Sequence, residues 1–127
     1  MTDRGKALVV DDSSDWREEL RELLQDNGFA VLTAHDRPTA LSALDTQPFD
    51  VAVVDVNLSD KTHNVDGLLI NRYIQDKGID TRVILISARV LAPQELAEVH
   101  PATFIEKSDI WKQLNLLLSE IDRTQAD

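Results

Sequence analysis

The sequence contains no cysteine, only four glycines and four prolines, and few aromatic residues in 127 positions. The absence of cysteine excludes disulfide bonds, catalysis by a thiolate and zinc sites built on cysteine. The low glycine and proline content, with 43% hydrophobic and 28% charged residues, is typical of an ordinary globular protein. No internal repeat, linker or low-complexity segment is visible, and the length fits one domain over residues 1–127.

Basic residues and long apolar runs are also scarce. Lys and Arg number 13 against 23 Asp and Glu, which gives a formal net charge of −10. Because phosphate contacts need clustered Lys and Arg, this charge argues against direct binding to nucleic acid or to an anionic membrane. It is compatible with divalent cations or a basic partner surface. The first apolar run, Ala7–Val10, is too short for a signal peptide or a membrane span, so we expect a soluble cytoplasmic domain.

Strand and helix patterns alternate five times along the chain. The predicted strands are Lys6–Val10, Phe29–Ala34, Val51–Val54, Arg82–Ile86 and Ala102–Ile105. The predicted helices begin at Ser13 or Ser14, at Asp36, at Gly67, at Pro93 and at Ser108 or Asp109. This alternation predicts an α/β domain with a parallel sheet wound on both faces. Its core should span about residues 6–121, followed by a polar, frayed tail at 122–127.

Polar residues follow four of these strands. Asp55 comes directly after the apolar run Val51–Val54, which is typical of a strand buried on both faces. Desolvating a carboxylate costs several kcal/mol unless something compensates, so Asp55 either caps the next turn or lies in a polar cleft held by a cation. Asp11-Asp12, Ser87 and Lys107 follow the first, fourth and fifth strands. Each of them has an ordinary structural explanation, but together they would surround one crevice at the carboxyl edge of the sheet.

The chemistry of such a crevice is coherent. Carboxylates within about 5 Å of one another repel by roughly 3 kcal/mol per pair at an effective dielectric near 20. A hard divalent cation removes this penalty, and Mg²⁺ prefers carboxylates, waters and phosphate oxygens. Asp55 beside such an ion is a candidate nucleophile toward phosphorus, with Lys107 and the Ser87 hydroxyl holding the phosphoryl oxygens.

On these residues the chain resembles the receiver domain of two-component response regulators, from Lys6 to about Ile121. The resemblance rests on Asp11-Asp12, Asp55, Ser87-Ala88 and Lys107, with Phe104 three residues before the lysine. It implies a flavodoxin-like, doubly wound five-stranded parallel sheet of order 2-1-3-4-5, with helices on both faces.

The resemblance also implies a phosphorelay function. Asp55 would accept a phosphoryl group from a histidine kinase or a histidine phosphotransfer protein, and the domain would take part in its own phosphotransfer and autodephosphorylation without being an enzyme. Asp11, Asp12, Asp55 and the backbone carbonyl of Asn57 would hold Mg²⁺, and Lys107 would pair with the phosphorylated Asp55. Ser87 and Phe104 would then switch the face formed by the fourth helix, fifth strand and fifth helix, where a downstream protein binds. Asn57 and Arg89 lie where family members tune the lifetime of the phosphoryl group.

Three features depart from the usual pattern of this family. Ser108 follows Lys107 in place of the common proline, so no cis peptide bond is expected there, and the approach of the lysine to Asp55 is left open. The polar connection Val56–Asp66 is about four residues longer than usual, either as a tolerated surface insertion or as a partner-specific contact or lid. The fourth helix is short and bounded by prolines, so a mobile output face is expected.

Other readings of the sequence stay open. A degenerate receiver would bind partners without phosphorylation, and a Mg²⁺-dependent phosphatase of the haloacid dehalogenase type would need an aspartate where Asn57 stands. The chain is either a stand-alone receiver or a piece of a larger protein. The histidines show no metal-ligand spacing. Trp16 and part of Trp111 are interpreted as core, with the output face as an alternative for Trp111.

Overall fold

The computed structural model describes residues 5–59 and 64–126, and for residues 121–126 only the backbone. Five parallel strands form one sheet in the order β2-β1-β3-β4-β5. The strands are β1 (Lys6–Val10), β2 (Ala30–Ala34), β3 (Val51–Asp55), β4 (Arg82–Ser87) and β5 (Thr103–Glu106). The helices are α1 (Ser14–Asp26), α2 (Arg37–Thr46), α3 (Asp66–Asp76), α4 (Pro93–Leu96) and α5 (Ile110–Ala126), and a 3₁₀ turn, η1 (Lys107–Asp109), precedes α5. The predicted doubly wound fold and strand order are confirmed.

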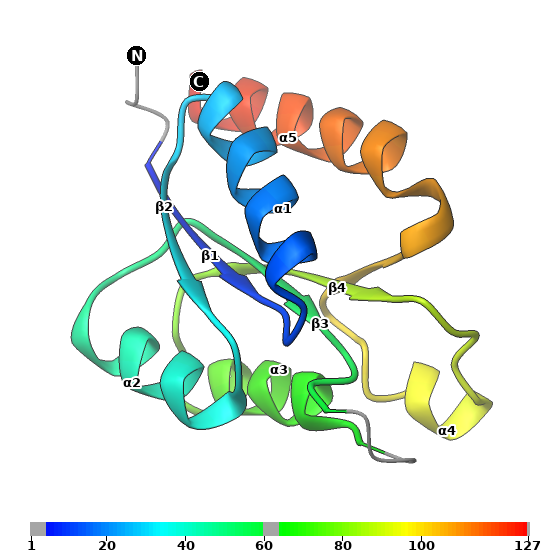
Figure 1. The fold of residues 1–127 in the computed structure, drawn as a ribbon. Coiled ribbons are helices and arrows are strands. Elements are labelled where there is room, and N and C mark those ends of the chain that lie inside the picture. The colour runs from blue at the N-terminus through cyan, green and yellow to red at the C-terminus, as the bar shows by residue number, and fades with distance from the viewer. Residues whose placement is uncertain (1–4, 60–63, 127) are drawn as a thin grey trace.

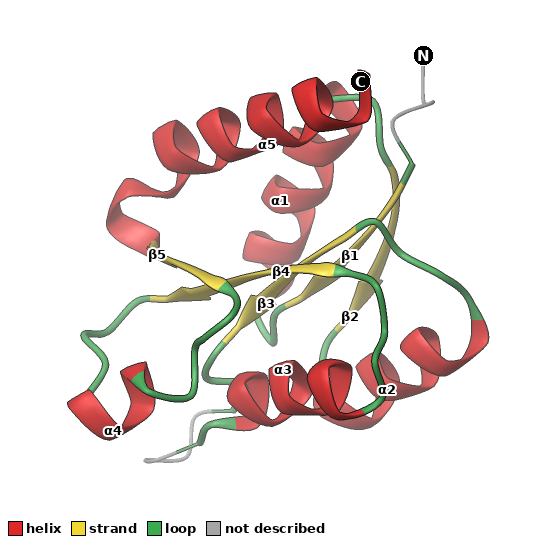
Figure 2. Cartoon of the chain, turned by 180° about the vertical axis from the view of Figure 1, so that it is seen from behind, coloured by secondary structure: helices red, strands yellow, loops and turns green. Residues whose placement is uncertain are grey.

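Helices cover both faces of the sheet, with α1 and α5 on one face and α2 and α3 on the other (Figures 1 and 2). Alternate residues of each strand point to opposite faces, so neighbouring strand residues enter two separate cores. Leu8 and Val10 join the core under α2 and α3, whereas Ala7 and Val9 join the core under α1 and α5. All five residues of β3 are buried, as expected for the central strand of such a sheet.

Local signals in the sequence fix where the first two helices begin. Ser13 is the N-cap of α1, and its hydroxyl accepts a hydrogen bond from the Trp16 amide at 3.4 Å. Asp36 caps α2 in the same way, with Oδ1 accepting from the Thr39 amide at 2.9 Å. These side chains satisfy amide groups that have no partner within the helix, as helix starts require.

The structure differs from the sequence-based boundaries at the carboxyl-terminal half. The fourth helix ends at Leu96 instead of Val99 and forms a single turn. Ser108 and Asp109 belong to η1 together with Lys107 and directly precede α5, so the predicted capping of the last helix by one of them stays a prediction. The last helix, α5, continues to Ala126, and the fraying expected of the polar tail stays a prediction.

Candidate functional site

The carboxyl ends of four strands bring the predicted site residues together. Asp11 follows β1, Asp55 ends β3, Ser87 ends β4 and Lys107 follows β5. Because β1, β3, β4 and β5 are consecutive neighbours in the sheet, their carboxyl ends meet along one edge. This edge lies where the chain reverses its winding direction, which is where open α/β sheets bind ligands.

Three carboxylates form the centre of this site. One oxygen each from Asp11, Asp12 and Asp55 lies within 4.8 Å of the other two. Asp11 and Asp55 are buried, with 0% and 5% of their surface exposed, whereas Asp12 is exposed. The backbone holds the buried pair in place, since the Ser13 amide donates to Asp11 Oδ1 at 3.0 Å and the Asn57 amide donates to Asp55 Oδ1 at 3.1 Å.

Lys107 supplies a positive charge to the cluster. Its Nζ lies 2.9 Å from Asp55 Oδ2, to which it donates a hydrogen bond, and 2.9 Å from Asp11 Oδ2. The sequence left the approach of Lys107 to Asp55 open because no proline follows, and the structure shows that η1 brings the ammonium there. Asp11 Oδ2 nevertheless accepts no hydrogen bond, alone among the fully buried side-chain oxygen and nitrogen atoms of the described residues.

The electrostatics of the site favour a further cation. Burial, together with the charge of Asp11, raises the pKa of Asp55 from 3.8 to about 6, although the contact with Lys107 opposes this. Burial alone would lower the pKa of Lys107, but its contacts with Asp11 and Asp55 outweigh burial and raise it. One ammonium therefore serves a cluster of three carboxylates, and the buried Asp11 Oδ2 contacts it as an ion pair without a well-aligned hydrogen bond. This donor set, all oxygen and under-neutralised, fits a hard divalent cation such as Mg²⁺.

A glycine allows α3 to start directly beneath this site. The Gly67 amide donates to the Val56 carbonyl at 3.0 Å. A Cβ atom at Gly67 would lie 2.1 Å from the Asp55 carbonyl oxygen and 2.6 Å from Val56 Cα. Both contacts are with backbone atoms that cannot move aside, so the close approach of α3 to the end of β3 requires glycine.

Ser87 is held by a neighbouring amide in this structure. Its hydroxyl donates to Asn57 Oδ1 at 3.3 Å, and the Arg89 Nε donates to the same oxygen at 3.2 Å. Arg89 also forms an ion pair with Glu95 of α4. The Asn57 side chain therefore links Ser87 to α4 through Arg89. The resemblance assigned the backbone carbonyl of Asn57 to the metal and placed Asn57 and Arg89 at positions that tune the phosphoryl lifetime, but it did not anticipate this side-chain network.

An aromatic ring contacts the lysine from the other side. The Lys107 Nζ lies 4.6 Å from the centroid of the Trp16 ring, which in turn stacks on Trp111 with 5.7 Å between centroids and 20° between planes. Trp16 packs against the core under α1 and α5, as predicted, but its contact with Lys107 was missed. Trp111 is 41% exposed and its ring stacks on Trp16, so part of this residue is covered and part faces solvent.

The remaining predicted residues lie beside the site or outside the described residues. Phe104 of β5 is partly buried and packs against the core under α2 and α3. Of the long connection, Asn64 contacts the site's surroundings: its backbone carbonyl accepts a hydrogen bond from the Asn57 side-chain amide at 2.6 Å. Residues 60–63, which include Lys61 and His63, lie outside the described residues.

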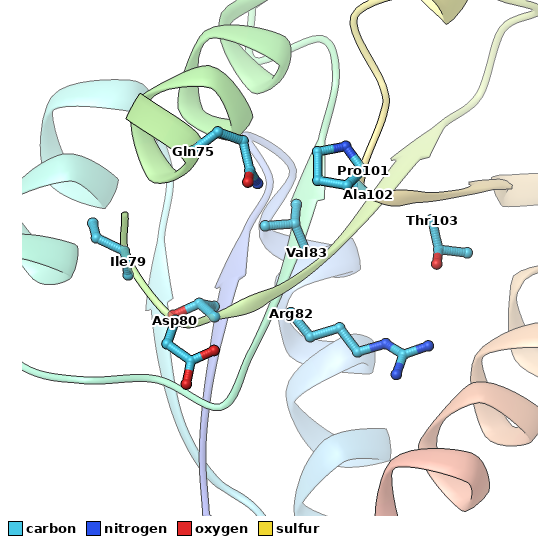
Figure 3. Close-up of a pocket in the computed structure, with 9 residues that line it drawn as sticks. Gln75, Ile79, Asp80, Arg82, Val83, Pro101, Ala102 and Thr103 are labelled. Atoms are coloured by element: carbon cyan, nitrogen blue, oxygen red, sulfur yellow. The ribbon is translucent and has the colours of Figure 1, made fainter. Parts of the chain in front are cut away.

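A hollow of about 450 Å³ lies at the opposite edge of the sheet (Figure 3). It is lined by residues at the amino ends of β4 and β5, including Arg82 and Thr103, and by the residues that precede them, such as Asp80 and Pro101. Gln75 of α3 closes one side. None of the site residues predicted from the sequence lines this hollow. The strand-end residues Asp11, Asp55 and Ser87 lie at the opposite edge of the sheet.

Comparison with known proteins defines the class that this fold and site represent. The family model for the response regulator receiver domain matches residues 7–115. The chain belongs to this family, and it is therefore a receiver domain of the two-component signalling type. No helix in the described ranges is long and apolar enough to cross a membrane.

Particular relatives share both sequence and fold with this chain. Response regulator MprA from Mycobacterium avium is 34% identical over 92 residues, which cover 72% of this chain and 39% of that protein. The chain thus spans about two fifths of the length of the curated relatives it matches. The chemotaxis protein CheY4 from Vibrio cholerae is 27% identical with a TM-score of 0.75, covering 91% of this chain and 97% of its own. The response regulator TrrA from Thermotoga maritima, solved in complex with Mg(2+)-BeF, is 26% identical with a TM-score of 0.77 and the same coverage.

Proposed function

We propose that Asp55 is the phosphoacceptor of a phosphorelay and that the domain takes its phosphoryl group from a phosphohistidine of a kinase or phosphotransfer protein. The observation that carries this proposal is a buried carboxylate at the end of β3 that lies beside two other carboxylates and 2.9 Å from Lys107. A burial-raised pKa near 6 leaves Asp55 mostly ionised, and so nucleophilic, at neutral pH.

The side chains divide the work of the transfer. An Asp55 oxygen attacks phosphorus, the bond from phosphorus to the donor histidine breaks with its electron pair going to the histidine nitrogen, and an acyl phosphate forms. Lys107 offsets the negative charge that gathers on the phosphoryl oxygens. Asp11, Asp12 and Asp55, with the backbone carbonyl of Asn57, would hold Mg²⁺, which supplies further charge neutralisation when bound. The TrrA structure, a relative solved with Mg(2+)-BeF, supports this assignment.

The proposed conformational switch starts from the hydrogen bond between Ser87 and Asn57. The Ser87 hydroxyl is bonded to Asn57 Oδ1, so it must leave this partner in order to reach a phosphoryl group on Asp55. Movement of Ser87 would give Phe104, which is only partly buried, space to turn inward. The surface formed by α4, β5 and α5 would then change shape, and a downstream protein would bind there rather than nucleic acid or a membrane.

The test is incubation with Mg²⁺ and a small acyl phosphate or phosphoramidate, followed by intact mass measurement. We expect one base-labile phosphoryl adduct on the wild type and none on Asp55→Asn. Asp80→Asn is the matched control, because Asp80 is an exposed aspartate that precedes β4 at the opposite edge of the sheet, and it should form the adduct at the wild-type rate. No adduct on the wild type with any donor or kinase would overturn the proposal in favour of a degenerate receiver that binds partners without phosphorylation.

A further inference from the structure

The ammonium of Lys107 is contacted from three sides. Two are the carboxylates of Asp11 and Asp55, each 2.9 Å away, and the third is the face of the Trp16 ring, 4.6 Å from Nζ to centroid. A cation within about 6 Å of an indole centroid is attracted by the negative charge of the ring face, and tryptophan is the best aromatic partner for such a contact. Only 9% of the Lys107 side chain is exposed, so water screens this attraction little.

A second tryptophan supports the first. Trp111 stacks on Trp16 with a centroid separation of 5.7 Å, within the range of favourable offset stacking. Trp111 lies four residues after Lys107, in the first turn of α5, whereas Trp16 lies in the first turn of α1. The stack therefore ties the segment that carries the lysine to α1, the helix that shares this face of the sheet with α5.

The attraction of the ring differs from that of the carboxylates in one respect. A divalent cation bound by Asp11 and Asp55 would use the same oxygen atoms that now attract the ammonium. The indole face lies outside the carboxylate cluster and keeps its charge distribution whatever the carboxylates bind. It can hold Lys107 beside Asp55 both with and without the metal.

We propose that Trp16 is a positioning residue, whose indole, braced by Trp111, holds the Lys107 ammonium against Asp55. This inference rests on the proposed function for its kinetic consequence, but the contact itself can be measured without any phosphoryl donor. Lys107 is followed by Ser108 and not by the proline common in this family. In this chain the Trp16–Trp111 pair and the turn η1 orient the lysine instead.

The contact is tested first by nuclear magnetic resonance. Protons above an indole face are shifted upfield by the ring current, so the Lys107 ε-methylene protons should resonate upfield in the wild type. The shift should persist in saturating Mg²⁺ and disappear in Trp16→Leu. Ordinary lysine shifts in the wild type, or an upfield shift that survives in Trp16→Leu, would overturn the inference whether or not Asp55 is phosphorylated.

The consequence is tested by the rate of adduct formation with Mg²⁺ and a small phosphodonor. Trp16→Leu should slow the reaction about two- to thirtyfold, the factor that corresponds to a cation–π contact between exposed and desolvated settings. Trp16→Phe keeps a weaker ring face and should be intermediate. Leu23→Ala is the matched control, because Leu23 is also partly buried against the core under α1 and α5, and it should leave the rate unchanged.

Fluorinated tryptophans separate ring charge from shape. The Trp111→Phe variant leaves Trp16 as the single tryptophan, which can then be replaced by fluorinated tryptophans. Each added fluorine lowers the negative electrostatic potential of the ring face and nearly preserves the size of the ring. The rate should fall stepwise while the melting temperature stays constant. A flat series, or wild-type rates in Trp16→Leu, would refute the positioning role and leave the proposed function standing. A wild type that forms no adduct would refute the proposed function, and the ring-current measurement would then decide the role of Trp16.

Discussion

Replacing Asp55 by asparagine should make the protein more stable near pH 7.5 when no divalent cation is present. The pKa of Asp55 is raised from 3.8 to about 6 by burial and by Asp11, so the ionised carboxylate disfavours the folded state. A difference of this size corresponds to about 3 kcal/mol at a pH above both values. The pKa of about 6 already includes the opposing contact with Lys107, so this contact is not subtracted a second time. The expected net gain is therefore about 3 kcal/mol.

The sign of the pH dependence provides a sharper test than the magnitude. The folded carboxyl group binds its proton more tightly than the unfolded one, so protonation of Asp55 favours folding. The wild type should lose this stabilisation as the pH rises from about 4 to about 6, and Asp55→Asn should not. The advantage of the variant should accordingly appear across this window and remain at higher pH.

Urea denaturation in a chelating buffer between pH 4 and 8 measures both quantities. Asp80→Asn serves again as the control, because Asp80 is exposed and outside the carboxylate cluster. Saturating Mg²⁺ should remove most of the difference at pH 7.5 by stabilising the wild type. The reasoning is refuted if the wild type and Asp55→Asn show parallel pH profiles, or if the variant is the less stable of the two at pH 7.5.

Three further predictions concern the site and its supports. Mg²⁺ at ten times its Kd should add about 1.4 kcal/mol to the free energy of unfolding, and a melting temperature indifferent to Mg²⁺ would contradict the assembled carboxylate site. Gly67→Ala should cost about 2 kcal/mol or more, because its Cβ would meet backbone atoms of Asp55 and Val56; an unchanged urea midpoint would show that α3 can shift away. Ser13→Ala should cost about 1 kcal/mol through loss of the α1 cap, whereas Ser13→Thr, which keeps the hydroxyl, should cost less.

The arrangement of strands and helices could be predicted because the signals for it are local. Runs such as Val51–Val54 are apolar without alternation, which indicates burial on both faces, and Ser13 and Asp36 are N-caps in the structure as in the prediction. The placement of Asp11, Asp55 and Lys107 at one edge followed from parallel strand direction alone. The sequence therefore predicts which residues lie at the carboxyl ends of the strands.

Side-chain partners at that edge could not be predicted in the same way. Trp16 has the helical spacing of a core residue, and nothing in this spacing reveals that its ring faces a lysine 91 positions later. The Asn57 side chain bridges Ser87 and Arg89 because two separate chain segments, one after β3 and one at the end of β4, converge there, and convergence is a tertiary property. The single-turn length of α4 was missed because Pro93–Val99 contains no signal that distinguishes one turn from two.

The single-turn length of α4 affects the energetics of the α4, β5 and α5 surface, to which we propose a downstream protein binds. A helix of four residues cannot sustain itself, since isolated helices shorter than about 12–15 residues are marginal in water. The segment around α4 is instead held by side chains from elsewhere: Arg89 pairs with Glu95, and the Asn71 amide of α3 donates to the Glu98 and Val99 carbonyls at 3.2 and 3.1 Å. Local unfolding of this segment requires these contacts, the Arg72–Glu98 ion pair and the packing of Leu91 and Val99 to break, which is still far less than opening the sheet. Its amide protons should exchange with solvent well before those of β3, so the surface that we propose contacts a downstream protein would also be the part of the domain that rearranges at the lowest free-energy cost.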